Sequence, residues 1–350
     1  MGLCQKIRSY YDLAGMYHVS SIFIGGGTPS ILETQQMRSI FDAIRATFPI
    51  DSDAEITVEV NPGTVDKLKL MAYRNVGINR LSIGLQSTDD QELKMLGRIH
   101  TYKDFLDTYT LAREVGFQNI NVDLMSGIPF QTLGGWEDTL KKVAELGPEH
   151  ISAYSLIIEE GTPFGERYGS EEGRKLLPDE DSEREMYHET KRFLKDCGYE
   201  RYEISNYARP GYACRHNIGY WTGVEYLGLG LGASSLVGGK RFQVTADLNR
   251  YLVFTKEELA AGAQYEEIHE LSRQERMEEF MFLGLRLTGG VRTAEFERRF
   301  GVAMEAVYGE VIERLLKEGL LEASVQTDSH IRLTEYGLDV STYALAEFLQ

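Results

Sequence analysis

Five short apolar segments, each followed by a stretch with helical periodicity, constrain the fold of this 350-residue chain more than any other feature. The segments are rich in Ile, Val and Leu and are bounded by turn residues, so we expect them to form strands. They span residues 21–24, 55–60, 80–85, 119–124 and 150–158. The predicted helices that follow or join them span residues 34–47, 64–75, 89–96, 102–115 and 135–146. A strand–helix pair about every 25 to 40 residues predicts a parallel α/β sheet, either open or part of a barrel.

Glycine and polar residues follow four of these strands at the point where each one ends. The first strand leads into Gly-Gly-Gly-Thr-Pro-Ser at 25–30, where the missing Cβ atoms would let a ligand approach the backbone. The other three strands end in EVNPG at 59–63, GLQS at 84–87 and DLMSGIP at 123–129. Such residues also punctuate ordinary loops. Four loops at one edge of a parallel sheet nevertheless predict a ligand site at the carboxyl ends of the strands.

Four polar side chains near these strand ends are candidate ligand-binding groups: Glu59, Gln86, Arg98 and Asp123. A carboxylate can hold ribose hydroxyls, and an arginine can bind a carboxylate with two parallel hydrogen bonds. Each residue alone is a weak indication, and Arg98 in LGRIH could equally be a surface arginine.

The remainder of the chain predicts two further regions, which divide it at 1–165, 166–265 and 266–350. A helix at 3–17 precedes the first strand, and a polar connection at 165–182 and a helix at 183–197 follow the fifth. Helices at 272–287, 293–300 and 304–318, with a small hairpin that turns at 327–329, resemble a winged-helix module. Its segment 270–350 holds 9 Lys and Arg against 15 Asp and Glu, a net charge of -6, which argues against nucleic-acid binding.

A tyrosine-rich stretch between these regions contains His216, Asn217, Tyr220 and Trp221. Histidine is a common axial ligand of heme iron, and flat aromatic rings could stack on a macrocycle. The alternative is a loop histidine beside two packed aromatic residues. Cys214 and a tyrosine also stay open as iron ligands.

Bulk properties favour a cytoplasmic protein. The net charge is -17, no run of about 18 apolar residues suggests a membrane span, and the amino terminus has no signal-peptide pattern. Cys4, Cys197 and Cys214 are too few and too scattered for a disulfide framework or a local metal site.

Taken together, GGGTPS, EVNPG, SIGLQS, LGRIH, NVDLMSGIP and AYSLIIEEGTP resemble the radical S-adenosylmethionine (SAM) family of oxygen-independent coproporphyrinogen III oxidases and their HemW heme-chaperone relatives. The motifs come in the family's order through essentially the whole chain. HNxxYW at 216–221 is similar to the signature of the chaperone branch. The resemblance implies a partial (βα)6 barrel that here lacks its first strand, with the C-terminal module, and a place in porphyrin metabolism.

The resemblance also implies the site residues. Gly26, Gly27 and Thr28 would contact the methionyl part of S-adenosylmethionine, with Glu59, Gln86, Arg98 and Asp123 completing the pocket; His216, Asn217, Tyr220 and Trp221 would serve heme. Family members carry a C-x-x-x-C-x-x-C motif for a 4Fe-4S cluster, and these 350 residues contain none. We interpret the sequence as an N-terminally truncated piece, with a natural clusterless relative as the alternative. The truncation predicts an open sheet edge beside 21–24.

Three functional hypotheses follow. The first is a heme chaperone without coproporphyrinogen oxidase activity, which would pass heme to acceptor proteins, with respiratory proteins among the candidates. The second is a radical SAM enzyme that oxidises a porphyrinogen side chain, and the third is an inactive fragment.

Overall fold

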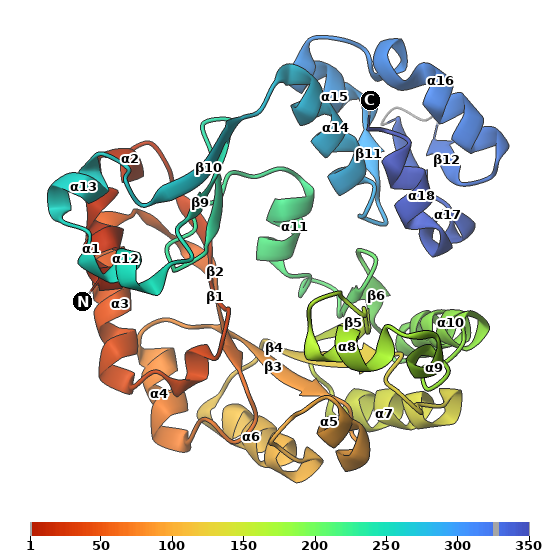
Figure 1. Ribbon diagram of the computed structural model, residues 1–350, viewed down its shortest axis with the longest axis horizontal. Coiled ribbons are helices and arrows are strands. Elements are labelled where there is room, and N and C mark those ends of the chain that lie inside the picture. The colour runs from red at the N-terminus through yellow and green to blue at the C-terminus, as the bar shows by residue number, and fades with distance from the viewer. Residues whose placement is uncertain (1, 325–328, 350) are drawn as a thin grey trace. The chain divides into compact units, whose positions relative to one another are not determined.

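The computed structural model describes residues 2–324 and 329–349, so two of the three residues in the predicted 327–329 turn lie outside it. The chain divides into two compact units, which Figure 1 shows in one view. Unit 1 comprises the described residues of Met1–Ser21, Gln35–Ala54 and Arg215–Gln350, and unit 2 comprises Ile22–Thr34 and Glu55–Cys214. Unit 1 is therefore assembled from three separate stretches of chain.

Unit 2 is built on a seven-stranded sheet in the order β1-β2-β3-β4-β5-β7-β6, with β1 at one end. The unit boundary runs through β1 and β2, whose first residues belong to unit 1. The strands are β1 (Val19–Ile24), β2 (Ile50–Val60), β3 (Arg80–Gln86), β4 (Ile120–Ser126), β5 (His150–Ser155), β6 (Glu200–Arg201) and β7 (Asn206–Ala208). Its helices are η1 (Pro29–Ile31), α4 (Lys67–Asn75), α5 (Asp90–Met95), α6 (Tyr102–Val115), α7 (Leu133–Leu146), α8 (Pro163–Tyr168), α9 (Glu171–Arg174) and α10 (Glu180–Asp196).

The sheet confirms the predicted partial βα barrel. β2, β3, β4 and β5 pair in parallel, and β7 and β6 then continue the sheet in antiparallel fashion. All five predicted strands are present, although β2 begins earlier than predicted and β5 ends at Ser155 rather than 158. β6 and β7 are too short to show a periodicity, so the sequence did not indicate them.

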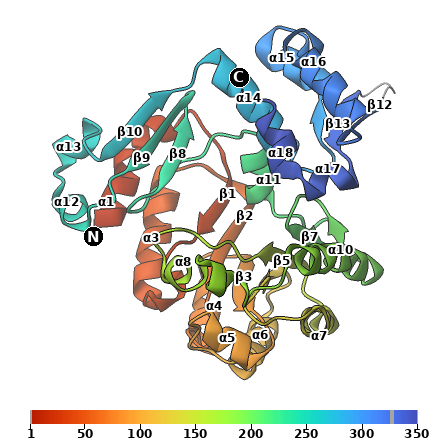
Figure 2. The ribbon, with the colours of Figure 1, turned by 45° about the vertical axis from the view of Figure 1, so that its right-hand side comes forward.

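The helices of unit 2 begin and end where local signals predict. α6 starts at a capping box formed by Thr101 and Asp104 and ends at Gly116, whose φ of 95° only glycine adopts readily. Helices α4 to α7 lie along one side of β3, β4 and β5, as Figures 1 and 2 show. Their buried residues include Leu70, Phe105 and Trp136, so this side of the sheet carries the apolar core.

Unit 1 contains the N-terminal helices and the C-terminal module. Its helices are α1 (Gly2–Ser9), α2 (Tyr11–Ala14), most of α3 (Thr34–Thr47), α11 (Arg215–Trp221), α12 (Leu248–Val253), α13 (Lys256–Ala260), α14 (Arg273–Gly284), α15 (Thr293–Phe300), α16 (Met304–Lys317), α17 (Glu335–Asp339) and α18 (Ser341–Ala346). Its strands are β8 (Ser234–Val237), β9 (Lys240–Val244), β10 (Tyr265–Glu270), β11 (Val291–Arg292), β12 (Leu321–Ser324) and β13 (His330–Leu333). Helices α14, α15 and α16 with the small sheet β11-β13-β12 match the predicted C-terminal module.

Two predicted segments differ from the structure. The expected helix at 3–17 is split into α1 and α2, because Tyr10 between them has a non-helical ψ of 9°. The expected polar connection at 165–182 contains most of α8 and all of α9, short helices that were not predicted and whose caps are the hydroxyls of Thr162 and Ser170. No helix in the described part of the chain is long and apolar enough to cross a membrane.

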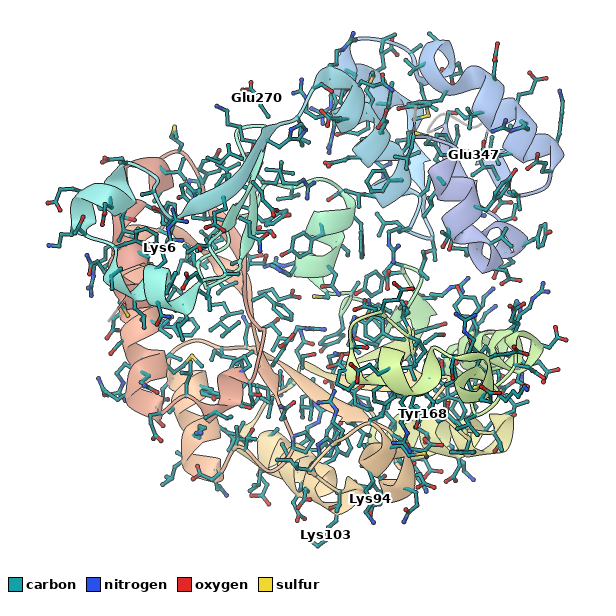
Figure 3. All side chains as sticks on the ribbon, viewed as in Figure 1. Lys6, Lys94, Lys103, Tyr168, Glu270 and Glu347 are labelled. Atoms are coloured by element: carbon teal, nitrogen blue, oxygen red, sulfur yellow. The ribbon has the colours of Figure 1, made fainter. Side chains whose placement is uncertain are left out.

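A buried lysine marks the core of unit 1. Lys6 on α1 is 1% exposed, and its Nζ lies 5.6 Å from the ring centre of Tyr251 on α12 and 5.4 Å from that of Tyr265 on β10 (Figure 3). The Tyr265 hydroxyl donates to the Tyr10 hydroxyl at 2.6 Å. Burial lowers the pKa of Lys6 to about 8. The amine is thus surrounded by aromatic rings rather than by water.

Candidate functional site

The strands of unit 2 carry polar residues on alternate positions, and these lie on one face. Glu59 of β2 pairs in register with Ser82 of β3, Ser82 with Asn121 of β4, and Asn121 with His150 of β5. Residues paired in register point to the same side of a sheet. Because the opposite side packs against helices, the polar row lies on the other face of the curled sheet.

The glycine loop after β1 meets this face at Glu59. The Gly26 N–H donates to Glu59 Oε2 at 3.0 Å. Gly26 and Gly27 have φ values of 82° and 60°, and a Cβ on either would meet no atom within 4 Å. At Gly25, by contrast, a Cβ would lie 2.9 Å from the Glu59 carboxyl carbon. The loop therefore packs its first glycine on a carboxylate and leaves space beside the next two.

Thr28 is tied to the loop after β2. Its Oγ1 accepts a long hydrogen bond, 3.4 Å, from Asn61 Nδ2. The Asn61 backbone N–H donates in turn to Ser30 Oγ at 3.2 Å. The predicted neighbours GGGTPS and EVNPG are thus in direct contact.

Gln86 ends β3 in an unusual backbone conformation. Its φ is 75°, one of three positive values at non-glycine residues in the described chain. The pairing of β3 with β4 shifts register between Gly84 and Gln86. A strained left-handed residue at a strand end is common at ligand sites, because the bulge redirects a side chain. The sequence placed Gln86 at the strand end but did not predict this turn of the backbone.

Asp123 on β4 is held by two donors. Asn121 Nδ2 donates to its Oδ1 at 2.7 Å, and Ser82 Oγ donates to its Oδ2 at 3.1 Å. Burial raises the pKa of Asp123 while these hydrogen bonds oppose the rise. Burial also raises the pKa of Glu59, and the nearby negative charge of Asp123 adds to that rise. The two carboxyl groups therefore face one polar region, where a positive ligand group would favour their ionised forms.

Arg98 lies in the loop after α5 and is half-buried. The same loop continues to His100, whose Nε2 is 3.2 Å from the Leu85 carbonyl oxygen near the end of β3. Burial lowers the pKa of His100, and the charge of Arg98 lowers it further. The loop that contains Arg98 therefore lies against the end of β3. Arg98 itself makes no hydrogen bond or ion pair with the carboxylates of Glu59 and Asp123.

A buried chain of hydrogen-bonded polar groups leads from Asp123 through Asn121 and His150, and we did not predict it from the sequence. Asn121 Oδ1 can only accept, so the His150 Nδ1 at 2.6 Å carries a proton. The His150 Nε2 then accepts from the Tyr202 hydroxyl at 2.9 Å. Burial lowers the pKa of His150 well below its usual value, so the ring stays neutral. The available signal was the alternation of polar and apolar residues in RLSIGLQ, NINVDLMS and HISAYS.

The HNxxYW residues form the helix α11 in unit 1. The His216 Nδ1 is 3.0 Å from Ser21 Oγ, and its ring meets the Tyr220 ring edge to face at 4.8 Å. The Trp221 ring lies 4.5 Å from the guanidinium of Arg286. Asn217 is half-buried on the same helix. The structure thus places His216 and Tyr220 together and turns Trp221 toward the C-terminal module.

Comparison with known proteins identifies the family. Residues 6–143 match the radical SAM superfamily, and residues 271–340 match the HemN C-terminal domain. A Bacillus subtilis protein named heme chaperone HemW is 36% identical over 346 residues, which cover 99% of this chain and 89% of the relative. The chain belongs to the HemW family. The Escherichia coli protein of that name is 35% identical and covers 91% of this chain and 81% of the relative.

The fold of this chain is also similar to the solved structure of a related enzyme. Coproporphyrinogen III oxidase (HemN) from Escherichia coli, titled a radical SAM enzyme, superimposes with a TM-score of 0.80 at 25% identity. The match covers 99% of this chain and 81% of HemN. The predicted family and the predicted partial barrel are both confirmed.

Membership of the radical SAM superfamily implies S-adenosylmethionine and a 4Fe-4S cluster, and this HemW-family chain fits the two unequally. Open space beside Gly26 and Gly27 and the half-buried carboxyls of Glu59 and Asp123 fit a small ligand with a positive group. A cluster has no such fit. Within residues 2–324 and 329–349 no three His, Cys, Asp or Glu side chains gather as a metal site. Cys4 donates to the Ser39 carbonyl and Cys214 to Glu55, so both thiols serve local packing.

Proposed function

We propose that this chain binds heme and passes it to acceptor proteins, a role in keeping with the name heme chaperone that its relatives carry. The observation that carries the proposal is the 36% identity over nearly the full chain to a protein named heme chaperone HemW. The HNxxYW helix supports it as the heme site. Metal-ligating histidines usually have one ring nitrogen fixed by a hydrogen bond, and Ser21 fixes Nδ1 of His216 in this way.

The roles on α11 follow from its geometry. Nε2 of His216 would face the iron, because Ser21 occupies Nδ1. Tyr220, which is 37% exposed, packs edge to face against both His216 and Tyr226, so its ring could support one face of the macrocycle. Asn217 and Trp221 would position the helix, since Trp221 contacts Arg286.

Titration with hemin, followed by the Soret absorbance, tests this function. We expect saturable binding by the wild type and at least a tenfold weaker Kd for His216→Ala, about 1.4 kcal/mol. His18→Ala removes an exposed histidine of the same unit and serves as the matched control. Equal binding by wild type and His216→Ala would show that another residue ligates the iron. No binding at all would reject the chaperone function itself.

S-adenosylmethionine binding is the second part of the proposal, and the glycine loop carries it. Gly26, Gly27 and Thr28 would approach the methionyl group, while Glu59 would pair with its ammonium. Asp123 and Gln86 would hold polar groups of the ligand, and Arg98 a carboxylate. Bound beside a reduced cluster, this cofactor supplies radical chemistry in the superfamily. We derive no such step, because the described residues do not fit a cluster.

Isothermal titration calorimetry with S-adenosylmethionine tests the pocket without requiring turnover. Burial raises the pKa of Glu59. We expect the affinity for S-adenosylmethionine to fall as the pH drops through this raised pKa, because a protonated Glu59 no longer attracts the ammonium group. Glu59→Gln should remove this pH dependence and weaken binding at neutral pH. Glu166→Gln, an exposed change on α8, is the control. A pH-independent affinity in the wild type would exclude Glu59 from the ammonium contact.

HemN similarity favours one further candidate, the oxidation of a porphyrinogen side chain. Incubation with coproporphyrinogen, reductant and S-adenosylmethionine distinguishes it from the chaperone. We expect no product, and accumulation of the decarboxylated porphyrinogen would favour the enzyme instead.

A further inference from the structure

A buried guanidinium whose Nε has no hydrogen-bond partner lies at the amino end of β3. Arg80 is the first residue of that strand and is 2% exposed. Its Nε is fully buried and has no hydrogen-bond partner. Nor does any hydrogen bond or ion pair join its side chain to another residue in the described ranges 2–324 and 329–349. A guanidinium keeps its positive charge in proteins, so an unpaired one is strongly disfavoured in an apolar interior.

A second unpartnered group lies beside it. Thr57 of β2 pairs in register with Arg80, so both side chains lie on the polar face of the sheet. Thr57 is 0% exposed, and its Oγ1 has no hydrogen-bond partner. Two neighbouring buried donors therefore lack any acceptor, although almost all buried polar groups in proteins have one.

The carboxylates of this face are already engaged by other donors. Asp123 accepts from Asn121 and Ser82, and Glu55 accepts from the Cys214 thiol at 3.3 Å. Glu203 Oε1 accepts from the Ser205 N–H at 2.8 Å and from Asn206 Nδ2. None of the three forms an ion pair with Arg80 in the described ranges, although the charge of Arg80 does lower the pKa of the Asp123 carboxyl.

Neutral groups complete the surroundings of Arg80. Burial and then the positive charge of Arg80 lower the pKa of His150, so the neutral ring lies within the electrostatic reach of the guanidinium. Burial raises the pKa of Tyr202, and Arg80 opposes that rise. His150 and Tyr202 bond to each other, so neither offers Arg80 a negative charge. What distinguishes the region is that Arg80 Nε and Thr57 Oγ1 are buried without a hydrogen-bond partner.

We propose that Arg80 and Thr57 bind the carboxylate group of a ligand. The flat guanidinium matches the two oxygens of a carboxylate with parallel N–H groups, and the threonine hydroxyl is a third donor. Arg80 lies six residues before Gln86 on β3, which is about 20 Å along a strand. This site is therefore centred away from Gln86 and the glycine loop, and Asp123, in register with Gly84, lies between it and the carboxyl ends of the strands.

Thermal unfolding of the full chain in sodium propionate, against sodium chloride of equal ionic strength, tests the proposal. We expect propionate to raise the Tm of the wild type by about 2 °C or more. Arg80→Lys keeps the positive charge but loses the parallel N–H groups of the guanidinium, and Thr57→Val loses one hydroxyl donor. Each variant should therefore remove most of the Tm shift. Lys94→Gln, an exposed charge on α5 (Figure 3), should keep it in full.

Two comparisons complete the test. Sodium octanoate carries the same carboxylate on a longer apolar chain. A larger shift than with propionate identifies the carboxylate end of a larger molecule, and an equal shift identifies a free small carboxylate. Either result supports the site. An equal Tm in propionate and chloride, an equal protection by phosphate, or an undiminished shift in both Arg80→Lys and Thr57→Val would overturn it.

Discussion

Replacing Lys6 by methionine should stabilise the protein at neutral pH. Burial lowers the pKa of Lys6 from 10.5 to about 8, a difference near 2.5 units. At 1.36 kcal/mol per unit, holding the charged amine in the folded state costs about 3 kcal/mol. The rings of Tyr251 and Tyr265 offset roughly 1 kcal/mol of this through cation–π attraction. Methionine fills a similar volume without a charge, so we expect a gain of about 2 kcal/mol.

The gain should depend on pH with a defined sign. Between about pH 8 and 10.5 the unfolded wild type binds the Lys6 proton more than the folded form does. Wild-type stability therefore rises with pH through this window, and the advantage of Lys6→Met shrinks. Burial also raises the pKa values of three neighbouring residues, Tyr10, Tyr251 and Tyr265. Their effect is to lower stability as the pH rises, and it is the same in the wild type and in Lys6→Met.

Urea unfolding at about pH 7 and about pH 9.5 measures the effect, and the two proteins are compared at each pH. Lys256→Met, an exposed lysine on α13 of the same unit, is the control and should change neither value. A Lys6→Met protein that is less stable than the wild type at neutral pH would refute the reasoning. So would an advantage that stays constant with pH.

Three further predictions concern the site. Gly25→Ala should weaken S-adenosylmethionine binding at least tenfold, about 1.4 kcal/mol, because its Cβ would lie 2.9 Å from the Glu59 carboxyl; calorimetry that finds unchanged affinity would contradict this. His150→Gln should lower the free energy of unfolding by about 1–3 kcal/mol, since it leaves buried partners unsatisfied, as urea titration can determine. Trp221→Ala should cost about 1–3 kcal/mol and Trp221→Phe less, because phenylalanine keeps a ring over Arg286. Equal losses for the two Trp221 variants would show that the ring contact contributes nothing.

Strand ends and helix limits could be predicted because local signals set them. The predicted helices 34–47 and 102–115 coincide with α3 and α6, whose ends are fixed by apolar periodicity and, for α6, by Thr101 and Gly116. The meeting of Glu59 with the glycine loop also follows from parallel topology, which collects strand ends at one edge. These features depend on neighbours in sequence or on the fold class alone.

Other parts of the site depend on contacts between distant segments, so single positions did not reveal them. The bond from His150 to Tyr202 spans 52 residues, and the one from Ser21 to His216 spans 195. The left-handed backbone of Gln86 arises where β3 loses register with β4, which no local propensity encodes. Tyr202 in particular lies next to strands too short to show a pattern.

The composition of unit 1 from three chain segments has a consequence for synthesis in the cell. Tyr10 and Tyr265 bond across 255 residues, and the lysine enclosure needs α1, α12 and β10 together. A growing chain emerges at about 5–20 residues per second, so α1 waits for tens of seconds before its partners leave the ribosome. Unit 2 is complete at Cys214 and can fold first. During that interval the apolar face of α1 is exposed, and holdase chaperones that bind emerging amphipathic helices would find it available.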